Sequence, residues 1–212
     1  MANLITLIRF ILLFILVGMA YQPNPKYQLI NLPLLTIIFI MDAVDGYVAR
    51  KRNEASLFGS IFDIVVDRIV ENVLLLILVD LDFIPVWVAI VFITRSFLVD
   101  SIRAHGSSKG QTPFGMMRSA FGKFLVAGRF MRLFYGIIKA ITFGYIFLIQ
   151  PWPVLFPDFY SQRLVIINSI KEILVYASVA MCIARGLPVL IEFSMSENGL
   201  FPFRKKPYSA SR

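Results

Sequence analysis

The sequence contains very little cysteine, histidine and charge for its 212 residues. The single cysteine, Cys182, cannot form an internal disulfide, and with only one histidine, His105, a zinc or iron–sulfur site is close to excluded. Any bound metal must therefore be held by oxygen. Only 16% of the residues are charged and 58% are hydrophobic, above the roughly 45–50% of soluble domains. A water-soluble domain could not bury so much apolar surface, so we expect the bilayer to be the solvent.

The net charge of +8 raises the alternative of a nucleic-acid-binding protein. The basic residues do not alternate with aromatic residues on a polar surface; they punctuate long apolar runs. That pattern is typical of the positive-inside rule of membrane proteins. It favours membrane lipids and anionic substrates as partners, and we do not expect the protein to bind nucleic acid.

Six apolar runs reach the length of about 20 residues that crosses a hydrocarbon core. They predict an all-α integral membrane protein with six transmembrane helices in one bundle, a membrane domain over residues 1–193 and a cytoplasmic tail over 194–212. The first run also resembles a signal peptide cleaved after Ala20, but we favour a retained helix. The expected spans are 4–21, 29–50, 58–80, 83–103, 121–149 and 164–190.

The charges of the loops predict the orientation of these spans. Three consecutive cations stand at 50–52 and three more at 204–206, whereas the loop at 80–82 is acidic. Loops rich in Lys and Arg stay in the cytoplasm. We therefore expect a multi-pass protein of the cell (inner) membrane with both termini cytoplasmic.

Four aspartates interrupt the apolar pattern within one short stretch. Each carboxylate costs about 2.5–3.5 kcal/mol to insert, so the set needs a reason. The first two are three residues apart and the last two four apart, so each pair shares one helix face. An antiparallel hairpin turning near 53–55 would bring all four to one level, on the order of 10–15 Å below the turn. The four residues are Asp42, Asp45, Asp63 and Asp67.

Such a group of like charges needs a counter-charge. Hard divalent cations with oxygen ligands, Mg²⁺ or Mn²⁺, supply it, and two ions close together could clamp a phosphoryl centre. Small residues at Gly46, Ala49 and Gly59 leave room where the two helices approach. Arg50, at the water boundary, is placed to reach a diphosphate.

The stretch from Asp42 to Asp67 matches the pattern D-x2-D-G-x2-A-R-x8-G-x3-D-x3-D. It resembles the signature of the CDP-alcohol phosphatidyltransferases. The resemblance implies a homodimer that transfers a phosphatidyl group from CDP-diacylglycerol to a small alcohol, with two divalent metal ions on the four aspartates and release of CMP. It also implies that Asp42 bridges the ions and that Asp67 is the general base. The residues expected to bind the CDP lipid are Gly46, Ala49, Arg50, Ser56, Gly59, Asn3 and Thr6.

A softer likeness, to phosphatidylglycerophosphate synthases, covers roughly residues 84–130 and the opening segment from Asn3 to Arg9. Pro85 and Trp87 belong to the later stretch, as do several cations. Positive-inside topology accounts for about half of these cations. A phosphomonoester would nevertheless pair well with them. We therefore expect sn-glycerol 3-phosphate as the acceptor, giving phosphatidylglycerophosphate, and a phosphate pocket formed by Arg95, Arg103 and Lys123.

Two departures keep other acceptors open. Arg68 stands where that group usually has Lys, as in relatives that use inositol phosphate, and Ser96 replaces an expected glutamate. The same reaction with inositol phosphate or another polar alcohol is therefore the alternative. From another class, a cation transporter could place an aspartate cluster along its pathway, although its acidic residues would be spread over several spans.

Overall fold

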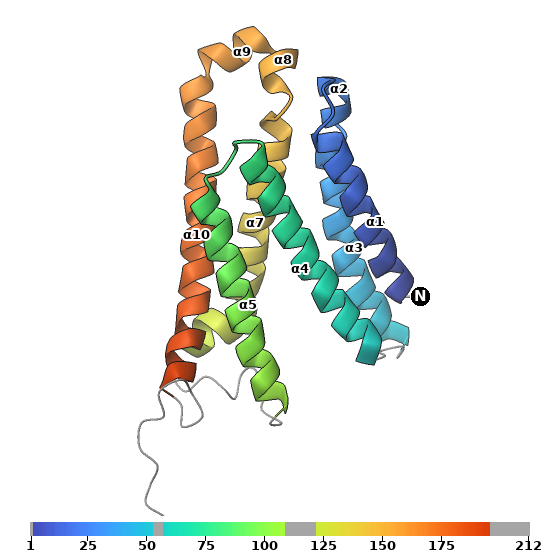
Figure 1. The fold of residues 1–212 in the computed structure, drawn as a ribbon, viewed down its shortest axis with the longest axis vertical. Coiled ribbons are helices and arrows are strands. Elements are labelled where there is room, and N and C mark those ends of the chain that lie inside the picture. The colour runs from blue at the N-terminus through green and yellow to red at the C-terminus, as the bar shows by residue number, and fades with distance from the viewer. Residues whose placement is uncertain (1, 53–56, 109–121, 196–212) are drawn as a thin grey trace, which may run out of the picture. The chain divides into compact units, whose positions relative to one another are not determined.

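The computed structural model describes residues 2–52, 57–108 and 122–195, and all of the regular structure in these ranges is helical (Figure 1). This confirms the predicted all-α class. The long helices of these ranges correspond one to one with the six predicted spans. They are α1 (Ala2–Ala20), α3 (Asn31–Arg52), α4 (Leu57–Asp80), α5 (Val86–Ser108), α7 (Arg129–Ile149) and α10 (Leu164–Ser194).

Within the described ranges, four segments are both long enough and apolar enough to cross a membrane: Asn3–Ala20, Pro25–Val44, Phe130–Leu155 and Leu164–Ser194. The protein is therefore a membrane protein. Helices α4 and α5 have the length of a span but carry more charge, including Asp63 and Asp67 in α4 and Arg95 in α5. Six spans remain a prediction for this reason.

The fifth predicted span, 121–149, is not one continuous helix. A π-helix, η1 (Lys123–Ala127), precedes α7, and Gly128 separates the two. A side chain at Gly128 would collide with the carbonyl oxygen of Phe124, so the break needs a glycine. Three short helices also occupy segments that we expected to be loops: α2 (Pro25–Gln28), α8 (Trp152–Leu155) and α9 (Pro157–Gln162).

The chain forms two compact units, of which the first comprises residues 1–89 and 137–178. In this unit α1 packs against both α3 and α4 (Figure 1). Leucines fill the core, and Leu16, Leu35 and Leu74 are almost completely buried. Polar contacts also join segments distant in sequence: the Gln150 amide donates to the Ala20 carbonyl oxygen at 2.8 Å.

The second unit comprises residues 90–136 and 179–212. It is built from most of α5, η1, the beginning of α7 and the end of α10. Its core is aliphatic, because Val99 and Ile102 of α5 pack with Leu125 and Val126 of η1 and Val189 of α10. The π-helix is therefore buried in this core and fixes where the chain enters α7.

Candidate active site

Three of the four predicted aspartates come together in the first unit. Asp42 projects from α3, and Asp63 and Asp67 project from α4. One carboxylate oxygen of each lies within 4.8 Å of the others. Their side chains remain 47%, 38% and 46% exposed, so a ligand can reach them. Asp45 also belongs to α3, but its side chain lies outside the described residues.

These three carboxylates form the acidic cluster of the protein. Unit negative charges at about this separation repel by roughly 3–4 kcal/mol per pair at an effective dielectric of about 20. The cluster therefore needs a cation. Its ligand atoms are all carboxylate oxygens, the donor set that Mg²⁺ and Mn²⁺ prefer. The three residues fit a divalent metal site.

Arg9 is a member of this site that the sequence analysis missed. It lies on α1 and its side chain is only 1% exposed. Its guanidinium donates hydrogen bonds to all three carboxylates: Nη1 to Asp42, and Nη2 to Asp63 Oδ1 at 3.1 Å and to Asp67 Oδ1 at 2.7 Å. The available signal was a cation inside the first apolar run, at the end of the opening segment from Asn3 to Arg9.

The other residues predicted to bind the CDP lipid are less fully described. Gly59 is partly buried on α4, Thr6 is buried on α1, and Asn3 is exposed at the start of α1. No described contact of theirs tests nucleotide binding. Ser56 lies outside the described residues, as do the side chains of Ala49 and Arg50 and the surroundings of Gly46.

A basic cluster lies in the second unit around the ring of Tyr135, which α7 contributes. The guanidinium carbons of Arg95 and Arg185 lie 5.6 Å and 5.3 Å from the centre of this ring. Arg185 is 4% exposed, and its Nη1 donates to the Met131 carbonyl oxygen at 2.7 Å. Gly186 makes room for Arg95, because a side chain there would place a carbon 2.6 Å from Arg95 Cγ.

Among the described residues, no carboxylate pairs with Arg95 or Arg185, and the Nε atoms of both are buried without a hydrogen-bond acceptor. Arg103 differs, since its Nη1 lies 3.9 Å from Asp100 Oδ1. The Lys123 side chain lies outside the described residues. Of the three predicted phosphate-binding residues, the structure thus places Arg95 in the basic cluster. It adds Arg185, which the sequence analysis left unassigned.

The model of the CDP-alcohol phosphatidyltransferase family matches residues 1–184. The chain belongs to this family. The match covers both aspartate pairs and the helix that carries Arg9. It also favours phosphoryl chemistry over the alternative of cation transport.

The chain is similar to several curated members of the family. It is 39% identical over 79 residues to a CDP-diacylglycerol–glycerol-3-phosphate 3-phosphatidyltransferase of Bacillus subtilis, an alignment that covers 37% of this chain and 41% of that protein. A protein of the same name from Rickettsia typhi is 27% identical over 101 residues, covering 48% and 57%. A CDP-diacylglycerol–inositol 3-phosphatidyltransferase 1 of Arabidopsis thaliana is 46% identical over 52 residues, covering 23% of each chain. The chain thus spans about half of the length of the first two relatives.

A third charged group of this family member contains a carboxylate that is paired within the protein. Glu71 of α4 is 11% exposed and accepts hydrogen bonds from Lys139 Nζ of α7 at 2.7 Å and from Arg68 Nη1 at 2.9 Å. Two cations thus surround one carboxylate, and the pair Glu71–Lys139 links two helices. The Arg68 side chain, which suggested an inositol-phosphate acceptor, is engaged in this contact.

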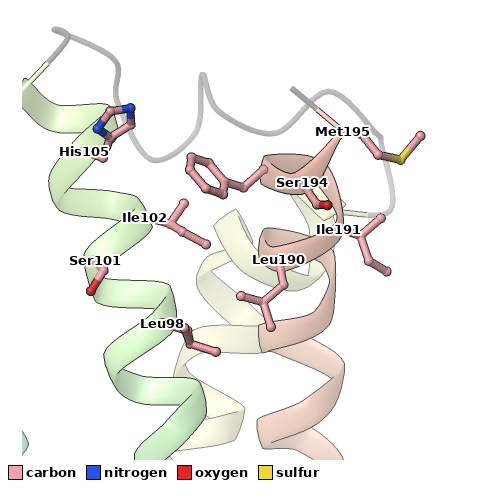
Figure 2. Close-up of a pocket in the computed structure, with 9 residues that line it drawn as sticks. Leu98, Ser101, Ile102, His105, Leu190, Ile191, Ser194 and Met195 are labelled. Atoms are coloured by element: carbon pink, nitrogen blue, oxygen red, sulfur yellow. The ribbon is translucent and has the colours of Figure 1, made fainter. Parts of the chain in front are cut away.

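The second unit also holds a cavity of about 720 Å³ between α5 and α10, lined by nine residues. Figure 2 shows Leu98 and Ile102 of α5 and Leu190 of α10 facing this space. His105, Ser101 and Ser194 supply the polar atoms of a lining that is otherwise mostly hydrocarbon. None of the described lining residues carries a carboxylate, the ligand type that metal-assisted phosphoryl transfer would need here.

Proposed function

We propose that this membrane protein transfers a phosphatidyl group from CDP-diacylglycerol to sn-glycerol 3-phosphate, giving phosphatidylglycerophosphate and CMP. One observation carries the proposal. Three aspartates of the family signature place their carboxylate oxygens within 4.8 Å of one another, as a divalent metal site requires. The names of the bacterial relatives support the same donor and acceptor.

In this reaction the acceptor hydroxyl oxygen attacks the phosphorus that bears the diacylglycerol, and the bond from this phosphorus to the CMP oxygen breaks. Asp67 takes the hydroxyl proton as the general base, because its carboxylate lies beside the other two. Together with Asp67, the residues Asp42, Asp45 and Asp63 would hold two divalent ions, Mg²⁺ or Mn²⁺. The bound metal would offset the charge that develops on the diphosphate. Gly46, Ala49, Arg50, Ser56, Gly59, Asn3 and Thr6 are proposed to bind the CDP lipid.

The phosphate of the acceptor is proposed to bind at the basic cluster. Arg95 and Arg185 carry two positive charges beside the ring of Tyr135, and no carboxylate among the described residues balances them. A phosphomonoester carries close to two negative charges near neutral pH and accepts hydrogen bonds from guanidinium groups. Arg103 and Lys123 are proposed to complete this pocket.

Inositol phosphate or another polar alcohol is the second candidate for the acceptor. The observation that favours it is the Arabidopsis relative, whose name specifies inositol, a polar alcohol without a phosphate. The basic cluster does not decide between the two acceptors, because both inositol phosphate and glycerol 3-phosphate carry a phosphomonoester. The hydroxyl that attacks differs between them, and a direct assay separates them.

The deciding experiment measures CMP release by the purified protein with CDP-diacylglycerol and Mg²⁺ or Mn²⁺. Glycerol 3-phosphate, inositol 1-phosphate, free inositol and serine are supplied in turn. We expect release with glycerol 3-phosphate and little with the others. Release with inositol 1-phosphate alone would replace the acceptor and keep the reaction class. No release with any acceptor, from a folded protein, would contradict the reaction class itself.

The proposed enzyme is a homodimer that crosses the inner membrane six times, with both termini cytoplasmic. Reporter fusions after residues 24, 54, 82, 112 and 158 should then alternate between outside and inside, beginning outside. A cytoplasmic signal at residue 158, or cleavage after Ala20, would overturn this topology. Crosslinking in native membranes would test the dimer.

A further inference from the structure

Arg9 is the one described cation that touches all three carboxylates of the acidic cluster. It is not a surface side chain that happens to reach them. At 1% exposure it is among the most buried large side chains of the described chain, and α1 packs against both helices that carry the aspartates. The guanidinium is therefore built into the site by the fold of the first unit.

The geometry suits a guanidinium better than a lysine. A planar guanidinium presents five donors in a fixed fork, so it can serve several carboxylates at once. Here Nη1 serves α3 through Asp42, while Nη2 serves α4 through Asp63 and Asp67. One positive charge against three negative charges leaves an excess of negative charge, so the cluster still attracts a divalent cation.

A metal ion on this cluster would contend with Arg9. The Oδ1 atoms of Asp63 and Asp67 already accept hydrogen bonds from its Nη2. A metal that takes these atoms competes with the guanidinium for their lone pairs, and a metal that takes the other oxygens must stand a few ångströms from it. Either arrangement brings two cations close together, so they repel each other.

We propose that Arg9 is a positioning residue that acts as a resident counter-cation: it holds the three aspartates together in the metal-free protein and competes with the divalent metal for them. This inference rests on the proposed function, because it requires that the acidic cluster bind metal. It implies two effects of opposite sign. Without Arg9 the metal-free protein loses stability, and the metal binds more tightly.

The test compares the wild-type protein with Arg9→Gln and Arg9→Lys in detergent. Free Mn²⁺ is measured by electron paramagnetic resonance during titration, and thermal unfolding is followed in EDTA and in saturating Mn²⁺. Arg9→Gln should bind Mn²⁺ about tenfold more tightly or better, since a nearby positive charge is removed. It should unfold at a lower temperature than the wild type in EDTA and recover with Mn²⁺. Arg185→Gln is the matched control: it also removes a buried guanidinium, but its Tm change should be the same with and without metal.

Arg9→Lys keeps the charge and loses the fork, so its Mn²⁺ affinity should lie between the other two. It decides the matter if Arg9→Gln does not fold. Tight Mn²⁺ binding by the wild type with equal or weaker binding by the folded variants would overturn this inference and leave the metal site intact. Absence of Mn²⁺ binding in every protein would overturn the metal site, and this inference with it.

Discussion

The acidic cluster of the first unit and the basic cluster of the second unit balance their charges differently. The three aspartates of the acidic cluster are about half exposed and already share a buried cation, Arg9. Both arginines of the basic cluster lie against the ring of Tyr135, Arg185 also donates to a backbone carbonyl, and neither pairs with a carboxylate within the part of the chain that the structure describes. One site carries its own counter-charge, whereas the other has none among the described residues.

This contrast indicates how each site is used. A buried charge without a counter-ion is costly, so it persists where a ligand supplies the missing charge. A cluster that already holds a cation can remain folded before its metal arrives. In the third group the Glu71 carboxylate is paired with Lys139 and Arg68 inside the protein, so this group gives a reference for a purely structural role. Substitutions in the three groups should therefore have different signatures.

The largest effect is expected in the acidic cluster. Asp67→Asn should lower kcat by about 10³-fold, the range in which a general base contributes, because the amide cannot accept the hydroxyl proton. Binding of the CDP lipid should remain measurable, since the other aspartates still hold metal. Asp42→Asn should weaken both binding and turnover. CMP release and a lipid-binding assay check these values, and a near-normal rate for Asp67→Asn would remove it as the base.

The next largest effect is expected on the stability of the protein and not on its catalytic activity. Lys139→Met removes one of the two cations that pair with the Glu71 carboxylate, Lys139 and Arg68, which should lower the free energy of unfolding by about 3 kcal/mol. The double variant Glu71→Leu/Lys139→Met should regain most of this loss, because the pair is then removed as a whole. Acceptor KM should not change in either. A raised acceptor KM would show that Glu71 and Lys139 contribute to acceptor binding and are not purely structural.

In the basic cluster, Arg95→Ala should raise the KM for the acceptor by about 30-fold, the effect of one lost hydrogen bond to a charged group. Arg185→Gln should raise it by a similar factor. Neither should change the affinity for the CDP lipid. Arg163→Gln serves as the control, because this arginine lies against Phe159 outside the cluster. If Arg185→Gln lowered only thermal stability, Arg185 would be a structural residue.

The smallest effect comes from two glycines. Gly186→Ala should raise the acceptor KM a few-fold, because the added carbon would lie 2.6 Å from Arg95 Cγ and push that side chain aside. Gly136→Ala meets nothing within 4 Å and should slightly stabilise α7, by about 0.5–1 kcal/mol. Measuring the acceptor KM of both variants separates the displacement of Arg95 from any effect that a glycine-to-alanine change has on a helix in general. Equal KM values for the two variants would contradict the role of Gly186.

Much of the fold was accessible from sequence because apolar length and helical period are local properties. Six runs predicted six long helices, and the spacing of Asp63 and Asp67 already placed them on one face of a helix. The convergence with Asp42 followed from equal distances to the predicted turn, although that turn lies outside the described residues. These inferences needed no knowledge of tertiary packing.

The parts that sequence could not supply depend on contacts between distant segments. Arg9 is 33 residues from Asp42 and 58 from Asp67, and nothing in the first apolar run says which helices it meets. Arg185 is a cation within a long apolar helix, and its place in the sequence does not show that it meets Tyr135. The break at Gly128 was missed because a glycine within an apolar run is also compatible with a continuous membrane helix.

The unequal lengths of α1 and α10 have a consequence for the surrounding lipid. The 19 residues of α1 extend about 28 Å, close to the roughly 30 Å of a hydrocarbon core, whereas the 31 residues of α10 extend about 46 Å. In a thicker bilayer α10 is still long enough to span the hydrocarbon core, but α1 is too short. The mismatch at α1 is then relieved by local thinning of the bilayer or by a smaller tilt of the helix. Since α1 carries Arg9 into the acidic cluster, a change in the tilt of α1 would move this guanidinium relative to the three aspartates.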